Sequence, residues 1–252
     1  MKFQILKKEL FSFSVLLILG SVLFLSAYYF SVNYAQNLSY DFLISLTAEK
    51  KLSKDIVVVS IDDQSINKIG RWPWKRKYYT DIFEFLENSA GAEVVAFDSI
   101  LVSYDQKASD REFFRRFNEL EKVIPGVFFS RQKSYFANNQ KSGLKKVFKD
   151  KFSVQVKDQR PERVKESAEY ASSSYALKEV VNAASAVGSV MSYPDKDGII
   201  RKFKPLTLFD GQHYPALGVS VFMHLYPDVE FKLFKNSLEI ENLSEDYSIP
   251  LK

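Results

Sequence analysis

The chain has 252 residues, of which 46% are hydrophobic, 15% aromatic and 26% charged, and its formal net charge is +4. The absence of cysteine excludes disulfides, thiolate metal sites and a cysteine nucleophile. The nine glycines form neither a G-x-G-x-x-G fingerprint nor a P-loop, which excludes nucleotide binding through such loops, and we expect no cofactor.

Residues 11–30 read FSFSVLLILGSVLFLSAYYF, with 15 apolar residues in 20 and no charge. At a rise of about 1.5 Å per residue, such a helix spans roughly the 30 Å hydrocarbon core of a bilayer. A signal peptide is the alternative, but its apolar region usually has about 7–15 residues, and no A-x-A-like site follows here. The segment therefore predicts a transmembrane helix.

Lys2, Lys7 and Lys8 precede this segment, and the positive-inside rule keeps them in the cytoplasm. We therefore expect a single-pass protein of the inner membrane, with the rest of the chain on the periplasmic or extracellular side. The parts expected are a cytoplasmic tail (1–10), the transmembrane helix (11–30), a stalk helix (31–50) and an extracytoplasmic domain (51–252).

Ala35, Leu38, Phe42 and Leu46 recur at three- and four-residue spacing, which predicts that the helix continues beyond the membrane as the stalk. Such a stripe suits either pairing with a second copy, giving a homodimer, or packing on the chain's own domain.

Alternating apolar patterns follow. Strands are predicted at Ile56–Ile61, Val94–Phe97 and Val123–Phe129, and helices at Tyr79–Ala90 and from Asp110. Ile56–Ile61 is nearly all β-branched, which is typical of a strand covered on both faces. Strands alternating with helices predict an α/β fold, with a mixed sheet built on a parallel βαβαβ core.

Most of the excess positive charge lies in residues 131–165, which hold 11 basic and three acidic residues. The rest of the chain has 24 basic and 28 acidic residues, so no nucleic-acid partner is expected. We interpret 131–163 as a basic insertion on the surface. It either contacts anionic lipid headgroups or envelope polymers, or is a solvated loop with no partner.

The remaining elements predicted are a helix over Val164–Ala184, two antiparallel strands on either side of the PDKDG turn at 194–198, a helix over Pro215–Tyr226 and a strand at Leu238–Ile240. After Tyr247 the chain is expected to stop before a further strand can pair.

Three carboxylates follow predicted strands. Asp62 and Asp63 follow the first strand and Asp98 follows the second. Ligands of open α/β sheets bind outside the carboxyl ends of the strands, so these carboxylates are expected to bind a cation or accept hydrogen bonds from a ligand.

Trp72, Trp74 and Arg76 lie in the loop that follows. The indoles could stack on a ligand and Arg76 could pair with an anion. Alternatively, the tryptophans fill the end of the sheet and Arg76 pairs with one of the three predicted aspartates.

His213 and His224 match no zinc-binding spacing, so we interpret both as structural. Asp195, Asp197 and Gly198 lack the later glutamate of a calcium loop and predict a turn. No metal site is predicted from these residues.

Five motifs occur in order along the chain: IDD at 61–63, GRWPWKR at 70–76, GAEVVAFD at 91–98, DKDGIIRKFKPL at 195–206 and HYPAL at 213–217. Over roughly residues 38–252 they resemble the type-2 CHASE domain. The resemblance implies an extracytoplasmic sensory domain of a bacterial receptor, of the kind associated with cyclases and protein kinases.

In that family the sensor is usually followed by further membrane helices and a cytoplasmic effector. The sequence up to Lys252 has no second membrane segment, kinase histidine box or cyclase domain. We therefore expect a C-terminally incomplete receptor, or a stand-alone sensor whose partner is a membrane-embedded cyclase or kinase.

Two functions fit these observations. The first is a membrane-anchored sensory domain for signal transduction, which is not an enzyme and binds an unknown ligand or partner. The alternative is a membrane-anchored hydrolase that holds magnesium or calcium with Asp62, Asp63 and Asp98.

Overall fold

A computed structural model describes residues 2–48, 53–101, 103–130, 142–161, 170, 172–174, 177–234, 237–241 and 247–250. The chain divides into two compact units, Met1–Ile61 and Asp62–Lys252.

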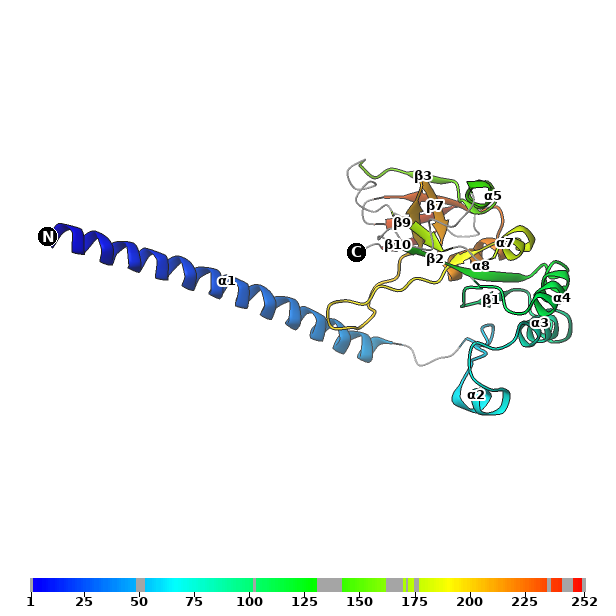
Figure 1. Ribbon diagram of the computed structural model, residues 1–252. Helices are drawn as coiled ribbons and strands as arrows, with labels where there is room; N and C mark the ends of the chain where they lie inside the picture. The colour runs from blue at the N-terminus through cyan, green and yellow to red at the C-terminus, as the bar shows by residue number, and fades with distance from the viewer. Residues whose placement is uncertain are drawn as a thin grey trace. The chain divides into compact units, whose positions relative to one another are not determined.

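The first unit is dominated by one long helix, α1 (Lys2–Thr47), which runs without a break (Figure 1). Its stretch Phe13–Thr47 is long and apolar enough to cross a membrane, and an 18-residue window within it has a mean hydropathy of 2.1. Thirty-five residues of helix extend about 50 Å, more than a bilayer core requires. The apolar segment and the expected stalk are therefore parts of a single helix.

The strand predicted at Ile56–Ile61 is wrong. These residues form no regular structure, and Val57 and Val58 are 81% and 84% exposed. A strand exists only where a neighbour accepts and donates its backbone hydrogen bonds, and the described part of the chain provides none for this run. The βαβαβ core predicted with Ile56–Ile61 as its first strand is therefore not confirmed.

The sheet of the second unit starts instead at β1 (Val95–Phe97), which pairs in parallel with β2 (Val123–Ser130). β2 also pairs in parallel with β5 (Gly188–Ser189) and antiparallel with β4 (Ser172–Ser174). The predicted strands near 94–97 and 123–129 and the mixed α/β sheet with parallel strands are confirmed.

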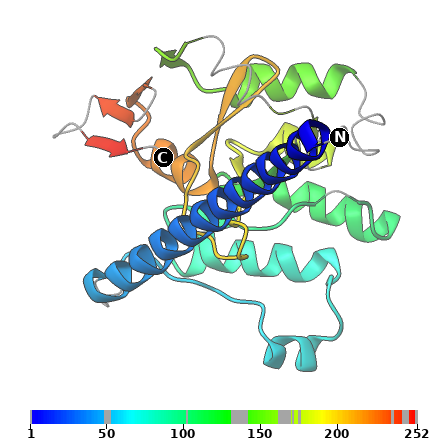
Figure 2. The ribbon, with the colours of Figure 1, turned by 90° about the vertical axis from the view of Figure 1, so that its left-hand side faces the viewer.

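Helices α3 (Arg76–Glu84) and α4 (Lys107–Phe117) lie side by side in this unit (Figure 2). One turn of π-helix, Phe85–Ser89, continues α3. The apolar faces of both helices enter the core, as their spacing predicts. The inward side chains are Tyr79 and Phe83 of α3 and Phe113 and Phe117 of α4.

The basic segment 131–163 is not an irregular surface insertion where the structure describes it. It contains helix α5 (Ser142–Phe152) and strand β3 (Val156–Asp158). Phe148 and Phe152, four residues apart, are 0% and 6% exposed and belong to the core. Residues 131–141 and 162–163 lie outside the described residues.

The helix predicted over Val164–Ala184 is confirmed at α7 (Lys178–Ala183). At residues 172–174 the prediction is wrong, because these residues form strand β4. Most of its first half lies outside the described residues. Three serines at 172–174 pair along β2, and tertiary pairing of this kind overrides local helical spacing.

The segments on either side of the PDKDG turn do not pair with each other. β5 joins β2, whereas β6 (Leu206–Phe209) forms a hairpin with β7 (Gln212–Pro215) across Asp210 and Gly211, both at positive φ. The predicted helix over 215–226 is confirmed as α8 (Leu217–Leu225).

A second sheet has the order β10-β9-β8-β3. The expectation that the last strand finds no partner is wrong, because β10 pairs antiparallel with β9. The strand predicted at Leu238–Ile240 is confirmed within β9, and this sheet has a small core of its own. The three strands after α8 are β8 (Glu230–Leu233), β9 (Ser237–Glu241) and β10 (Tyr247–Pro250). Figure 1 labels several of these elements.

Candidate functional site

The three predicted carboxylates are all exposed. Asp62 caps helix α2 (Asp63–Ile69), and its Oδ1 accepts hydrogen bonds from the Ser65 backbone N–H (2.9 Å) and hydroxyl (2.7 Å). These bonds hold the pKa of the Asp62 carboxyl below its usual value. Asp63 begins α2, and Asp98 follows β1. Among the described residues no three His, Cys, Asp or Glu side chains form a group that could hold a metal ion, so the hydrolase alternative is not supported.

The two tryptophans pack as part of the core. The Trp74 side chain is buried, and its Nε1 donates a hydrogen bond to the Gly70 carbonyl at 2.7 Å. The Trp72 ring lies edge-on to Trp74 and Tyr79, with ring centroids 5.6 and 5.7 Å away. This arrangement matches the architectural alternative for the loop. Trp72 is half-buried, so ligand contact at this residue stays a prediction.

Arg76 is buried in α3, and its partner is an aspartate that the sequence analysis missed. Its Nε lies 3.5 Å from Asp110 Oδ1, and the two side chains are only 9% and 6% exposed. Arg76 Nη2 also donates a hydrogen bond to the Ser103 carbonyl oxygen. The guanidinium carbon lies 5.8 Å from the centre of the Phe113 ring. Asp110 is three residues from Phe113, so its place on the inner face of α4 could have been read from the spacing.

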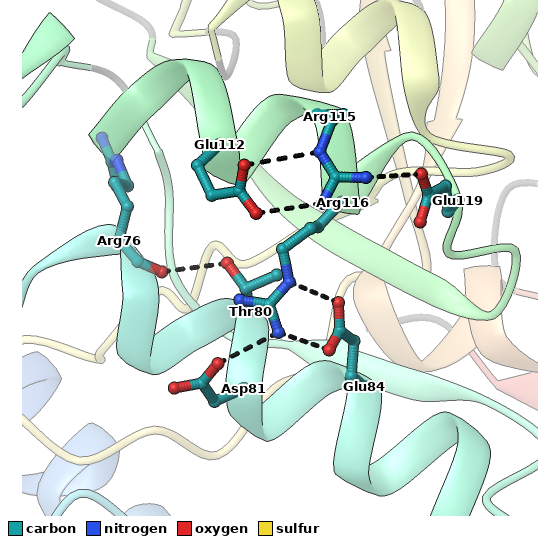
Figure 3. Close-up of polar contacts among 8 residues, drawn as sticks. All are labelled: Arg76, Thr80, Asp81, Glu84, Glu112, Arg115, Arg116 and Glu119. Atoms are coloured by element: carbon teal, nitrogen blue, oxygen red, sulfur yellow. Dashed lines mark hydrogen bonds and ion pairs between the residues drawn. The ribbon is translucent and has the colours of Figure 1, made fainter. Parts of the chain in front are cut away.

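Arg116 joins α4 to α3 (Figure 3). Its Nε donates to Glu84 Oε1 at 2.6 Å, and its Nη2 contacts both the other Glu84 oxygen and Asp81, the latter at 3.0 Å. The bond from Arg116 holds the pKa of Glu84 below its ordinary value of 4.5. Among the described residues, the neighbouring Arg115 pairs with Glu112 of α4 and with Glu119, two residues beyond the end of that helix.

The different partners of these two arginines predict different costs of removal. Arg116→Ala should lower the free energy of unfolding by about 1 kcal/mol, because it removes the bidentate interaction between Arg116 of α4 and Glu84 of α3. Arg115→Ala, whose side chain is 59% exposed against 19% for Arg116, should change it by less than about 0.5 kcal/mol. Urea unfolding followed by tryptophan fluorescence measures both.

The acid dependence of this difference is a second readout. Since Glu84 titrates below its unfolded value when folded, its contribution is complete above pH 4.5 and is lost as pH falls through the folded-state pKa. The gap between wild type and Arg116→Ala should therefore narrow in acid. Equal costs for the two arginines at neutral pH would contradict this description.

A cavity of about 300 Å³ lies elsewhere in the second unit, in a place that no sequence motif indicated. Three distant stretches of the chain form its wall: the end of α5, the turn before β5, and the region from β7 to just beyond α8. Its lining residues are Lys151, Phe152, Ser153, Val154, Ser185, Ala186, Val187, Pro215, Ser220, Met223, His224 and Pro227.

The chemistry of this lining combines an apolar floor with basic and hydroxyl groups. Lys151 is exposed, and its Nζ donates to the Asn182 carbonyl at 2.6 Å and lies 5.3 Å from the centre of the Phe152 ring. Partial burial lowers the pKa of the Lys151 ammonium. His224, interpreted from sequence as structural, is half-buried and lines the same cavity.

The other histidine, His213, lies in a largely buried polar cluster. Its Nε2 is 3.2 Å from Asp158 Oδ2. Arg160 donates two hydrogen bonds to the same carboxylate, of 2.9 and 2.7 Å. Arg160 and His213 together hold the pKa of Asp158 below its usual value against the opposing effect of burial. The cluster links the end of β3 to β7, which fits the structural role predicted for His213.

Comparison with known proteins identifies the class. The family model described as the CHASE2 domain matches residues 15–251, nearly the whole chain, and the chain belongs to this family. CHASE2 domains are extracytoplasmic sensory domains, typically found in receptors linked to cyclases and kinases. No curated protein and no solved structure matches the chain.

Proposed function

We propose that the protein is a membrane-anchored sensor that α1 holds in the bacterial inner membrane, with the unit Asp62–Lys252 on the periplasmic or extracellular side. The observation that carries the proposal is the CHASE2 match over residues 15–251, which includes most of the apolar part of α1. Lys2, Lys7 and Lys8 support this orientation through the positive-inside rule.

Signalling then follows from a shift between two arrangements of the sensory unit and α1. A ligand or partner that binds one arrangement more tightly raises its population and so biases a protein in the membrane. The partner expected from the family is a cyclase or kinase. The chain would contact this partner either as a monomer or as a homodimer paired through α1. Catalysis by the chain itself is not part of the proposal.

The ligand contacts predicted from sequence divide by burial. Asp62, Asp63 and Asp98 are exposed and Trp72 is half-buried, so each is within reach of a ligand. Trp74 and Arg76 are buried, so any contribution they make acts through packing. The chain's two tryptophans, Trp72 and Trp74, make intrinsic fluorescence a direct report on this loop.

The orientation is tested by single-cysteine labelling, because the chain has no cysteine of its own. Ser89 is exposed, and Ser89→Cys should react with a small membrane-impermeant maleimide in intact cells. Gln4→Cys, in the tail expected inside, should react only after permeabilisation. The reverse pattern would place the unit Asp62–Lys252 in the cytoplasm and overturn the proposal.

A further inference from the structure

The cavity beside α5 and α8 has the size and the lining of a small-molecule site. Its volume of about 300 Å³ lies at the lower end of the range for ligand pockets. All of its lining residues are described, and all belong to the unit Asp62–Lys252. It is separate from the loop of Trp72 and Trp74 that the sequence motifs indicated.

The charge of the lining residues indicates which kind of ligand the cavity can bind. Lys151 carries the formal charge, and none of the described lining residues is acidic. An ammonium has three N–H donors, and the bond to the Asn182 carbonyl engages one of them, so others are left for a ligand. The hydroxyls of Ser153 and Ser220 and the His224 ring add polar groups around the same space. An anionic group of a ligand fits this side of the cavity.

The apolar lining residues indicate the chemical character of the rest of the ligand. Phe152 and Val154 are buried, and Val187, Pro215 and Met223 add further carbon surface. A fully hydrated small ion would leave this apolar surface exposed to water. A compact apolar group would bury the surface and release its water, which is favourable. The lining therefore suits a ligand with an anionic group at one end and a small hydrocarbon body at the other.

We infer that this cavity is a binding site for a small organic carboxylate with an apolar body, and that Lys151 pairs with the carboxylate. The inference rests on the proposed function, since it names the class of molecule that the sensor would detect. The lining includes Phe152 and Val187 of the main core and Val154 of the second core, so the cavity lies where the two cores adjoin.

The test uses the full chain in lipid nanodiscs and isothermal titration calorimetry, with empty nanodiscs as the blank. Benzoate is the probe, acetate lacks the apolar body, and benzyl alcohol lacks the charge. Lys151→Met keeps an unbranched apolar side chain, one heavy atom shorter than lysine, and removes the charge. Lys146→Met is the matched control, because Lys146 is an exposed lysine of the same helix that does not line the cavity.

Benzoate should bind the wild type at least about tenfold more tightly than acetate or benzyl alcohol, and Lys151→Met should weaken it by about tenfold or more. Lys146→Met should leave the affinity unchanged. Absence of benzoate binding, or equal affinity in Lys151→Met, overturns the inference. If residue 89 is labelled from outside in that case, the proposed sensor stands without this site, whereas labelling only after permeabilisation overturns the proposed function whatever benzoate does.

Discussion

Arg76→Met is expected to lower the free energy of unfolding by about 3–5 kcal/mol, which is among the largest effects of a single substitution in this chain. The substitution leaves the Asp110 carboxylate buried with no opposite charge beside it, because Arg76 Nε is its ion-pair partner at 3.5 Å. Urea unfolding followed by the fluorescence of Trp72 and Trp74 reports on the same loop. Far-UV circular dichroism follows the rest of the chain.

Two further variants isolate the cause. Arg71→Met removes an exposed arginine from the same loop and should be close to neutral. Arg76→Met combined with Asp110→Leu removes both charges and should recover much of the lost stability, because no uncompensated charge stays buried. A double variant as unstable as Arg76→Met would show that packing, rather than the ion pair, explains the loss.

Gly188→Ala is expected to cost about 3 kcal/mol. A Cβ atom added at Gly188 would lie 2.4 Å from the Cα and 2.9 Å from the backbone nitrogen of Leu217, the first residue of α8. Backbone atoms cannot rotate away as a side chain can, so either β5 or α8 must shift. Thermal unfolding of the full chain measures the effect.

Gly218→Ala is the matched control for this substitution. Gly218 is the next residue of α8, and an added Cβ there meets nothing within 4 Å. Because alanine favours a helix over glycine, this variant should be stabilised by roughly 0.5 kcal/mol. A neutral Gly188→Ala would contradict the close approach of β5 to α8.

Local patterns predicted the centre of the second unit well. The apolar runs at Val94–Phe97 and Val123–Phe129 became β1 and β2, and the spacing around Phe113 became α4. Each of these elements buries the face that its own pattern defines. Short-range periodicity is therefore sufficient where burial and local preference agree.

Composition misled the interpretation where charge concealed a pattern. The lysine-rich composition of 131–163 indicates a surface insertion, yet Phe148 and Phe152 lie on one side of α5 and enter the core. Two large aromatic residues four positions apart were enough to bury that face. The many lysines around them reflect the exposed side of an amphipathic helix.

Other misses depend on the assembled fold. The β-branched run Ile56–Ile61 has the composition of a buried strand, but pairing decides whether a strand exists, and composition does not reveal pairing. One alternative from the sequence pairs Arg76 with Asp62, Asp63 or Asp98, but in the structure Arg76 of α3 pairs with Asp110 of α4. The cavity joins residues as far apart as Lys151 and Pro227, so no short motif could have indicated it.

The most direct test of an anchored, outward-facing sensor is the ratio of maleimide labelling at residue 89 in intact cells to that in permeabilised cells, measured on Ser89→Cys. With α1 in the membrane and the unit Asp62–Lys252 outside, the ratio should approach one, while the ratio for Gln4→Cys stays near zero. A ratio near zero at residue 89 would contradict the account.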